Sequence, residues 1–252
     1  MIGNLIPIDL VNGKAFFREI SFYEYKNICK MLMSTDIKDI NDCIEYLFKE
    51  NITSTRPLNI VDKFKCLINI RNTILGTEVS FMQDEKRVNV NLSEILDKEF
   101  NNDNIEYDIL TFNSPNNFYS SSYSDYIAEC LIAIKGEDIS ELTFEQRKIL
   151  LGETDLSLTN IYRKLLEVFG ERNIEIYKGI NVNLYNQEYI LTFLKNIMYE
   201  DLFQIIEFEY ACIRNLDFKA TDFKNYTYPE LKIFLNHLNK EKQDEKNAMR
   251  DR

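Results

Sequence analysis

Apolar and polar positions change period twice within the first fifty residues. Two strand-like runs flank Asn12-Gly13, and an Asn-Gly pair between such runs predicts a β-hairpin because both turn residues need positive φ. A helical period follows, opened by the capping-box pair Ser21 and Glu24, and a second helix restarts at Asp36. The apolar positions of the two predicted helices are Phe22, Tyr25, Ile28, Cys29, Leu32, Ile37, Ile40, Ile44, Leu47 and Phe48.

The segment after Pro57 predicts a third helix that leads into a second β-hairpin. Apolar residues keep helical spacing as far as Leu75, and Gly76 stands where a C′ glycine ends a helix. Two alternating runs then flank a polar turn at residues 83–87, which is the pattern of paired strands. A further strand is expected at residues 105–112.

From residue 124 onward the pattern predicts helices only. Residues 125–136 read as one helix that ends at Gly136. Thr143 and Gln146 form a second capping-box signature before the next helix. The apolar positions of the later predicted helices are Ile161, Leu165, Val168, Phe169, Tyr185, Tyr189, Phe193, Ile197, Leu202, Ile205, Ile206, Leu231, Phe234, Leu235 and Leu238.

These patterns predict an α+β fold that is predominantly helical. Residues 1–120 are expected to form a mixed domain in which two short β-hairpins pack with helices, and residues 121–240 an all-α domain. The boundary falls near residues 113–124, with residues 171–184 as the alternative. Residues 241–252 form a mixed-charge tail that cannot bury apolar surface, so disorder is expected there.

Charge and cysteine content narrow the classes of partner. The 252-residue chain has a net charge of -11, which opposes binding to the phosphate backbone, so nucleic acid is not expected as a partner. No apolar run of about 18 residues or more predicts a membrane span, and we expect a cytosolic protein. The five cysteines are odd in number, widely spaced and set in apolar helical patterns, which is typical of buried free thiols.

Motifs that bind cofactors or metals are missing from the sequence. The seven glycines are too far apart for a phosphate-cradling loop or a dinucleotide fingerprint. The chain has one histidine, His237, and no CxxC pair, so we expect neither a zinc site nor a cofactor. His237 stands beside an apolar stripe and is interpreted as structural.

The densest group of carboxylates near an apolar helix leaves two interpretations open. Glu200, Asp201 and Glu207 could perform acid–base chemistry if burial separated their pKa values, as in a hydrolase or transferase. Glu200 and Asp201 also suit a solvated helix start, where negative charge complements the helix dipole. The second interpretation needs no cleft, and the sequence offers no sign of one.

Aromatic residues are abundant toward the C-terminal end. The chain has 15 Tyr and 17 Phe but no Trp, and many of them fall in residues 184–228. For each aromatic residue taken alone, packing in the hydrophobic core is a sufficient explanation. A small helical unit, however, has limited interior volume, and Tyr is enriched in interface hot spots, so a partner-binding surface is expected among them.

Three segments together resemble the baseplate hub assembly family of T-even-type contractile-tailed phages. They are GKAFFREISFYEYKNICKMLMSTDIKDINDCIEYLFKENI, DKFKCLINIRNTILGTEVSF and KRVNVNLSEI, within about residues 8–96. In that family a hairpin leads into two helices, then into a leucine-rich helix with an arginine and a glycine before a second hairpin. The residues in the matching places are Ile70, Arg71, Leu75, Gly76 and Val79.

The segment of about residues 185–243 is similar to a small helical chaperone of the same assembly system. Both have an aromatic-rich helix, an acidic helix start, a second helix, a loop and a last helix with a charged tail. Two places differ from the family. Residues 82–86 replace metal-ligand-like cysteines seen in some relatives, and Arg214-Asn215 replaces a pair of histidines. The resemblance therefore implies no metal.

The resemblance implies a non-enzymatic protein of baseplate hub assembly, either an assembly chaperone or a permanent part of the hub. Its expected partners are other tail or hub proteins, with a homo-oligomer also open, and its expected location is the host cytoplasm or the virion tail. The competing hypotheses are the carboxylate enzyme and a helical adaptor unrelated to phage tails. The residues expected to contact a partner are Phe193, Tyr199, Phe203, Phe208 and Tyr210.

Overall fold

The computed structural model describes residues 5–10, 13–83, 85–100 and 103–250. Its helices are α1 (Phe22–Met31), α2 (Ile37–Asn51), α3 (Ile60–Leu75), α4 (Ser93–Leu96), α5 (Tyr123–Cys130), α6 (Phe144–Gly152), α7 (Leu158–Gly170), α8 (Gln187–Met198), α9 (Leu202–Leu216), the 3-10 turn η1 (Asp222–Lys224) and α10 (Tyr228–Arg250). Its strands are β1 (Leu5–Leu10), β2 (Gly13–Arg18), β3 (Ile52–Ser54), β4 (Glu78–Gln83), β5 (Lys86–Asn91), β6 (Ile105–Tyr107), β7 (Leu110–Phe112), β8 (Leu131–Ile134), β9 (Glu137–Asp138), β10 (Asn173–Tyr177) and β11 (Ile180–Asn183). The predicted α+β class is confirmed.

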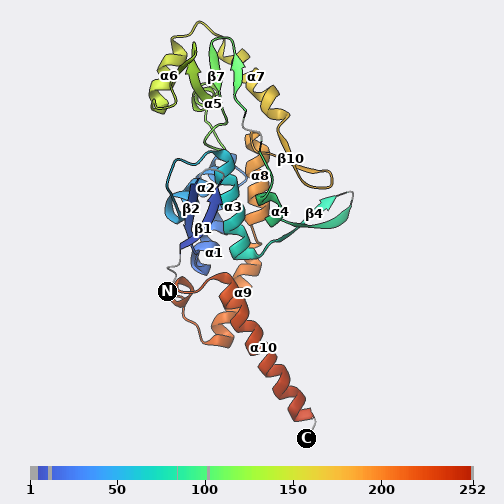
Figure 1. Ribbon diagram of the computed structural model, residues 1–252. Coiled ribbons are helices and arrows are strands. Elements are labelled where there is room, and N and C mark those ends of the chain that lie inside the picture. The colour runs from blue at the N-terminus through green and yellow to red at the C-terminus, as the bar shows by residue number, and fades with distance from the viewer. Residues whose placement is uncertain (1–4, 11–12, 84, 101–102, 251–252) are drawn as a thin grey trace.

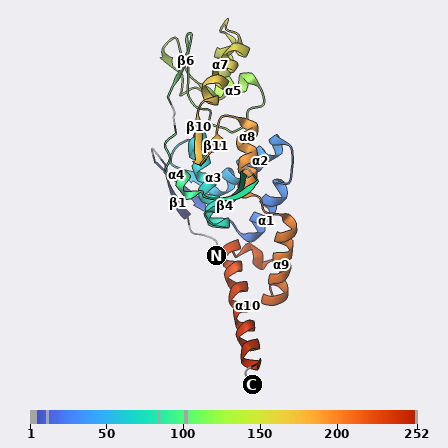
Figure 2. The same cartoon turned by 90° about the vertical axis from the view of Figure 1, so that its right-hand side faces the viewer.

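Three parts follow one another along an elongated molecule (Figures 1 and 2). The central body contains α1, α2, α3 and α8 with the sheet β1-β2-β3. At one end lies the sheet unit, residues 105–170, in which α5, α6 and α7 accompany the four-stranded sheet β6-β7-β8-β9. At the other end lies the helical end, formed by α9, η1 and α10, from which the C-terminal half of α10 projects.

The predicted first hairpin forms the main sheet of the central body. β1 pairs antiparallel with β2 in a register that sets Ile8 opposite Ala15, and β3 joins the other edge of β2. Alternate side chains on β2, including Phe17, are buried beneath the helices. Residues 11–12, which hold the first residue of the predicted Asn-Gly turn, lie outside the described residues.

Helix α3 runs through the centre of the molecule and ends where the sequence predicted. Gly76 caps it at φ +84°, which a residue with a Cβ rarely adopts. Arg71, one of the family-matching residues, donates hydrogen bonds to the carbonyl oxygens of Ile197 (3.1 Å), Gly76 and Glu78 (2.7 Å). Its guanidinium therefore joins the end of α8 to the start of the second predicted hairpin, β4-β5, which is confirmed.

The N-terminal and C-terminal segments pack on each other across the boundary that the sequence predicted at residue 120. α8 packs on α2 and α3, α9 packs on α1, and α10 packs on α3. The buried ring of Phe22 lies 5.5 Å from Phe208, 5.3 Å from Phe223 and 5.5 Å from Tyr228, measured between ring centroids. The sheet unit is thus inserted in the chain between two segments that together form the central body. The periodicity of apolar residues reports only local structure, so it could not predict this long-range packing.

The prediction of an all-α segment at residues 121–240 is wrong. The expected helix at residues 125–136 ends at Cys130, and the following run LIAI forms β8, which pairs with β7. A short apolar run is equally compatible with a buried helix and with a buried strand, so its periodicity could not distinguish the two. β10 and β11 form a further hairpin in this segment. The single strand expected at residues 105–112 is itself a hairpin, turned at Asp108 with φ +54°.

The tail also differs from the prediction of disorder. Helix α10 continues through residue 250. It starts on the buried side chain of Leu231, and its later residues are mostly Lys, Glu, Gln and Asn, largely exposed. Lys and Glu are strong helix formers, and oppositely charged residues three or four positions apart stabilise an exposed helix. A segment with few apolar residues can therefore extend a helix that is already anchored.

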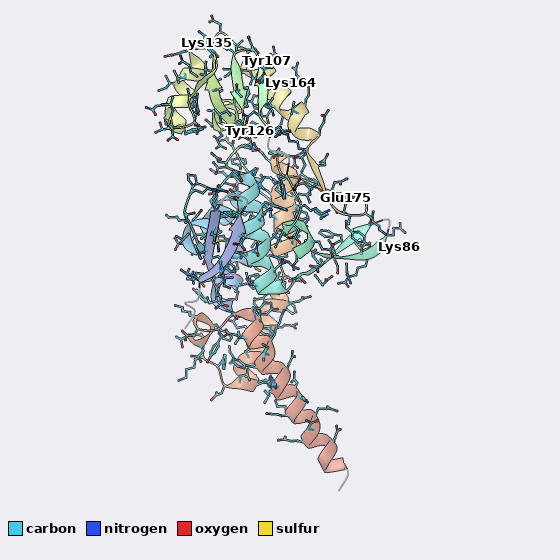
Figure 3. The ribbon with its side chains drawn as sticks, in the orientation of Figure 1. Lys86, Tyr107, Tyr126, Lys135, Lys164 and Glu175 are labelled. Carbon is cyan, nitrogen blue, oxygen red and sulfur yellow. The ribbon has the colours of Figure 1, made fainter. Side chains whose placement is uncertain are left out.

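Figure 3 gives reference points within these parts. Tyr126 lies at the end of the sheet unit that is nearer the central body, and Lys135 lies at the far end. Lys86 marks the tip of the β4-β5 hairpin and Glu175 lies on β10, the neighbouring hairpin. The two hairpins touch where the side-chain amide of Gln83 donates to the backbone oxygen of Lys178 (2.8 Å).

Candidate interaction surface on helix α9

One face of α9 is packed into the core. Ile205 and Cys212 are fully buried on it. The ring of Phe208 makes an edge contact with Tyr228 at 4.9 Å and a tilted contact with Phe22. At the margin of this face, Lys26 of α1 forms an ion pair with Glu209 at 2.7 Å. These contacts hold α9 in a fixed orientation on α1 and α10.

A second apolar face of α9 lies in solvent. Phe203 is 66% exposed, Ile206 47%, Tyr210 61% and Ile213 42%. The four residues follow one another in steps of three, four and three, the spacing of a coiled-coil seam, and so form one stripe along the helix. We call these four residues the outer stripe. It lies about a third of a turn from the buried face, given 3.6 residues per turn.

Charges beside the outer stripe are mainly negative. Asp201 caps the helix, and its carboxylate accepts a hydrogen bond from the Phe203 backbone N–H at 2.8 Å. Glu207 and Arg214 are exposed and flank the same edge of the outer stripe. A carboxylate at a helix start complements the positive end of the helix dipole. The surface is an apolar stripe with a carboxylate at its start and with Glu207 and Arg214 along one edge.

The geometry of α9 is suited to receiving another apolar helix. No known relative adds to that reading. Comparison with protein-family models, with curated proteins and with solved structures found no match to this chain. A function for the surface has to be argued from its residues.

The five residues predicted to contact a partner separate into two groups. Phe203 and Tyr210 lie on the outer stripe. Phe193 does not: it is buried, its ring is stacked on Phe81 at 6.0 Å, and its prediction as a contact residue is corrected. Tyr199 and Phe208 are half-buried and packed against the core, so neither offers a free face.

Two members of the outer stripe, Ile206 and Ile213, were not among the contact residues predicted from the sequence. The signal that could have found them is the seam spacing around Phe203 and Tyr210. It was obscured because α9 carries two apolar stripes, and periodicity alone does not say which one faces the core. Burial of the inner stripe resolves this.

The candidate catalytic carboxylates are spread along the helix start. Asp201 serves as the N-cap, and Glu207 is exposed on α9. Glu200 is half-buried before the helix, with Lys232 at 4.0 Å. None of the three lines any of the four main surface cavities formed by the described residues. The solvated helix start is therefore the interpretation that the geometry favours.

Other kinds of site were sought in the described part of the chain. Within it, no group of three or more His, Cys, Asp and Glu side chains is arranged to hold a metal ion. No helix in the described ranges is long and apolar enough to cross a membrane. All five cysteines are buried and free, as predicted, and burial raises the pKa values of Cys43 and Cys66 to about 12. His237 is exposed on α10.

Proposed function

We propose that this chain is a baseplate hub assembly protein of a contractile-tailed phage and that it acts through protein–protein contacts. The observation that carries the proposal is the outer stripe, four apolar side chains exposed at coiled-coil spacing. Isolated exposed apolar residues need no explanation, but a contiguous stripe on a fixed helix is typical of an interaction surface. The family resemblance supplies the biological setting.

The arrangement of the two family-like segments supports the same proposal. The hub-factor-like segment, about residues 8–96, and the chaperone-like segment, about residues 185–243, pack on each other through the rings around Phe22. A buried aromatic contact of this kind is expected between parts that function as one unit. The outer stripe lies in the chaperone-like segment, on the side of α9 away from that contact.

The occupant proposed for the outer stripe is an amphipathic helix with a basic border, carried by another hub or tail protein. Its apolar residues would interdigitate with those of α9, because both sides then share the helical repeat. Its Lys or Arg side chains would complement Asp201 and Glu207, and the net charge of -11 would steer a basic partner toward the chain.

Mass spectrometry of purified virions and of an infected-cell lysate tests the proposed role. A fixed copy number in particles identifies a permanent part of the hub. Abundance in the lysate with absence from particles identifies an assembly chaperone that leaves. Absence of the chain from infected cells would contradict both roles and would favour a helical adaptor unrelated to phage tails.

The proposed surface is tested by a double substitution, Phe203→Ser with Tyr210→Ser. We expect partner affinity to fall by at least about 30-fold, since a buried interface aromatic costs about 2 kcal/mol or more when truncated. The matched control is Tyr46→Ser with Tyr177→Ser, two exposed tyrosines on α2 and β10. Equal recovery of tail proteins with both double variants and with the native chain would contradict the assignment of the outer stripe.

A further inference from the structure

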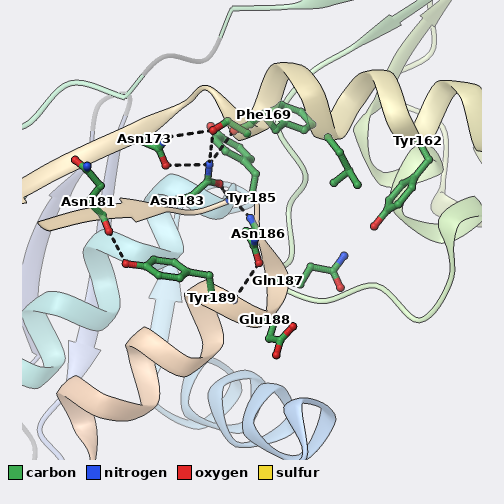
Figure 4. Close-up of a pocket in the computed structure, with 12 residues that line it drawn as sticks. Tyr162, Phe169, Asn173, Asn181, Asn183, Tyr185, Asn186, Gln187, Glu188 and Tyr189 are labelled. Atoms are coloured by element: carbon green, nitrogen blue, oxygen red, sulfur yellow. Dashed lines mark hydrogen bonds between the residues drawn. The ribbon is translucent and has the colours of Figure 1, made fainter. Parts of the chain in front are cut away.

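A pocket lies where the sheet unit meets the central body (Figure 4). It is bounded by α7, by the β10-β11 hairpin and by the first turn of α8. Its volume is about 620 Å³, which falls within the range of about 300–1,000 Å³ that is usual for sites of small organic ligands. The pocket contains none of the residues of the outer stripe, so it is a separate feature of the molecule.

Aromatic rings form the floor and two sides of the pocket. Phe169 and Tyr185 are buried and stacked, with ring centroids 4.5 Å apart and planes 11° apart. Tyr162 and Leu166 come from α7 on one side, and Tyr189, 44% exposed, comes from α8 on the other. Phe169 and Tyr185 form a packed base, and the exposed ring of Tyr189 offers a flat apolar surface to a ligand.

The amide of Asn183 fixes the shape of this region. Its Nδ2 donates to the backbone oxygens of Phe169 (3.0 Å) and Gly170 (3.2 Å), at the end of α7. Its Oδ1 accepts from the backbone N–H groups of Tyr185 (2.9 Å) and Asn186 (3.1 Å), just before α8. One side chain thus joins β11 to the ends of two helices, and the pocket is held open by bonds within the protein.

A second bond fixes the opposite wall. The hydroxyl of Tyr189 donates to the backbone oxygen of Asn181 at 2.5 Å, which holds the tyrosine ring against the hairpin. Its ring remains at the pocket surface (Figure 4). A binding site that is shaped before its ligand arrives loses less conformational entropy on binding.

The polar groups at the rim are neutral amides and one carboxylate. The side-chain amides of Asn181, Asn186 and Gln187 line the pocket together with Glu188. Asn186 and Gln187 use their oxygens to accept backbone N–H groups of Tyr189 and Ser120, which leaves their NH₂ groups as donors toward a ligand. Burial raises the pKa of Tyr162, so its hydroxyl is a further donor at neutral pH.

Cations are missing from the lining. Among the described residues that line the pocket there is no Lys, Arg or His. A ligand with a phosphate or carboxylate group would face the carboxylate of Glu188. One guanidinium lies near but outside the lining, that of Arg172, which is placed over the rings of Phe169 (5.1 Å) and Tyr185 (5.9 Å). Anionic ligands of this kind are normally bound through direct contacts with Arg or Lys, which the lining residues do not supply.

We propose that this pocket binds a neutral oligosaccharide. The apolar face of a sugar ring fits against Tyr189, and sugar hydroxyls can donate to Glu188 and accept from the amides of Asn186 and Gln187. Hydroxyl groups both donate and accept, which matches a rim of amides better than an apolar ligand would. The proposal rests on the pocket alone and is independent of the role proposed for the outer stripe.

The test is a titration of the full-length chain with maltotriose, cellotriose and triacetylchitotriose, followed by amide chemical shifts in two-dimensional NMR. ADP and a short neutral peptide, at the same concentrations, represent the anionic and peptide classes. The variants are Tyr189→Ala and Glu188→Gln, both at exposed positions. Tyr210→Ala on α9 is the matched control, and the NMR spectrum of each variant reports whether it is folded.

We expect saturable shifts at residues 181–189 with at least one trisaccharide. Both pocket variants should weaken that binding at least tenfold, and Tyr210→Ala should leave it unchanged. The proposal is overturned if none of the trisaccharides causes saturable shifts in this segment. It is also overturned if ADP or the peptide binds as tightly as the sugars, or if the folded pocket variants bind as the native chain does.

Discussion

Truncation of Phe22 should destabilise the whole protein, because this ring joins segments that lie about 200 residues apart in the chain. Phe22 is fully buried on α1 and touches Phe208, Phe223 and Tyr228 of the helical end. Replacement of a core Phe by Ala costs about 3–5 kcal/mol. With three aromatic neighbours left facing a cavity, we expect Phe22→Ala to lower the free energy of unfolding by about 4 kcal/mol.

Urea denaturation monitored by far-UV circular dichroism measures this loss. The whole protein is expected to have only about 5–15 kcal/mol of stability, so the midpoint should fall clearly while the slope m stays constant. Tyr23→Ala is the matched control: this neighbouring ring is 40% exposed, and its contact with Lys224 at 5.1 Å is worth about 0.5–1 kcal/mol.

Hydrogen exchange in α9 shows whether the two segments are coupled. If α1 and α9 share one core, Phe22→Ala should reduce the protection of α9 amides by the same free energy as the global loss. A loss below about 1 kcal/mol, well under the range for a buried Phe, would refute the reasoning. So would a two-step unfolding curve in which α9 keeps its native protection.

Three further predictions follow from local features. Gly76→Ala should lower the free energy of unfolding, measured by urea denaturation, by about 1–3 kcal/mol, because φ +84° and ψ -178° suit only glycine. The control Gly152→Ala, within α6, should leave the free energy of unfolding unchanged. Equal effects of the two substitutions would contradict this prediction. The five buried thiols should react with a thiol reagent at pH 8 only after unfolding, and rapid labelling of the native chain would contradict their burial. Hydrogen bonds from Lys148, Ser121 and Ser122 lower the pKa of Asp125 to about 2. The Asp125 carboxylate should therefore stabilise the protein at neutral pH, and this stabilisation should disappear as the pH falls from about 4 to about 2. It is measured as the difference in free energy of unfolding between the native chain and Asp125→Asn.

Local signals in the sequence predicted the local structure well. The capping boxes at Ser21 and Thr143 both form, since each depends on two residues within one turn. Gly76 ends α3 for the same kind of reason. The apolar run of β8 was misassigned because strand or helix was decided by its pairing with β7, which comes from elsewhere in the chain.

The two proposed binding surfaces, the outer stripe and the pocket, were harder to predict from the sequence. Phe203 and Tyr210 were predicted to contact a partner and are exposed, but Phe193, on the preceding helix, has the same aromatic character and is buried. Only the packing of α8 between other helices separates them. The pocket was not predicted, because its amides and rings are brought together by the hairpin β10-β11, and the pattern from residue 124 onward predicted helices only.

Site-specific photocrosslinking from α9 tests the central claim most directly. Tyr210 is replaced by the photoreactive p-benzoylphenylalanine, with the same replacement at Tyr46 as the control, and crosslinks are formed during infection and mapped by mass spectrometry. The account predicts that position 210, and not position 46, crosslinks to an amphipathic helix with basic flanks in a hub or tail protein. Crosslinks only to a second copy of this chain, or to no tail protein, would contradict it.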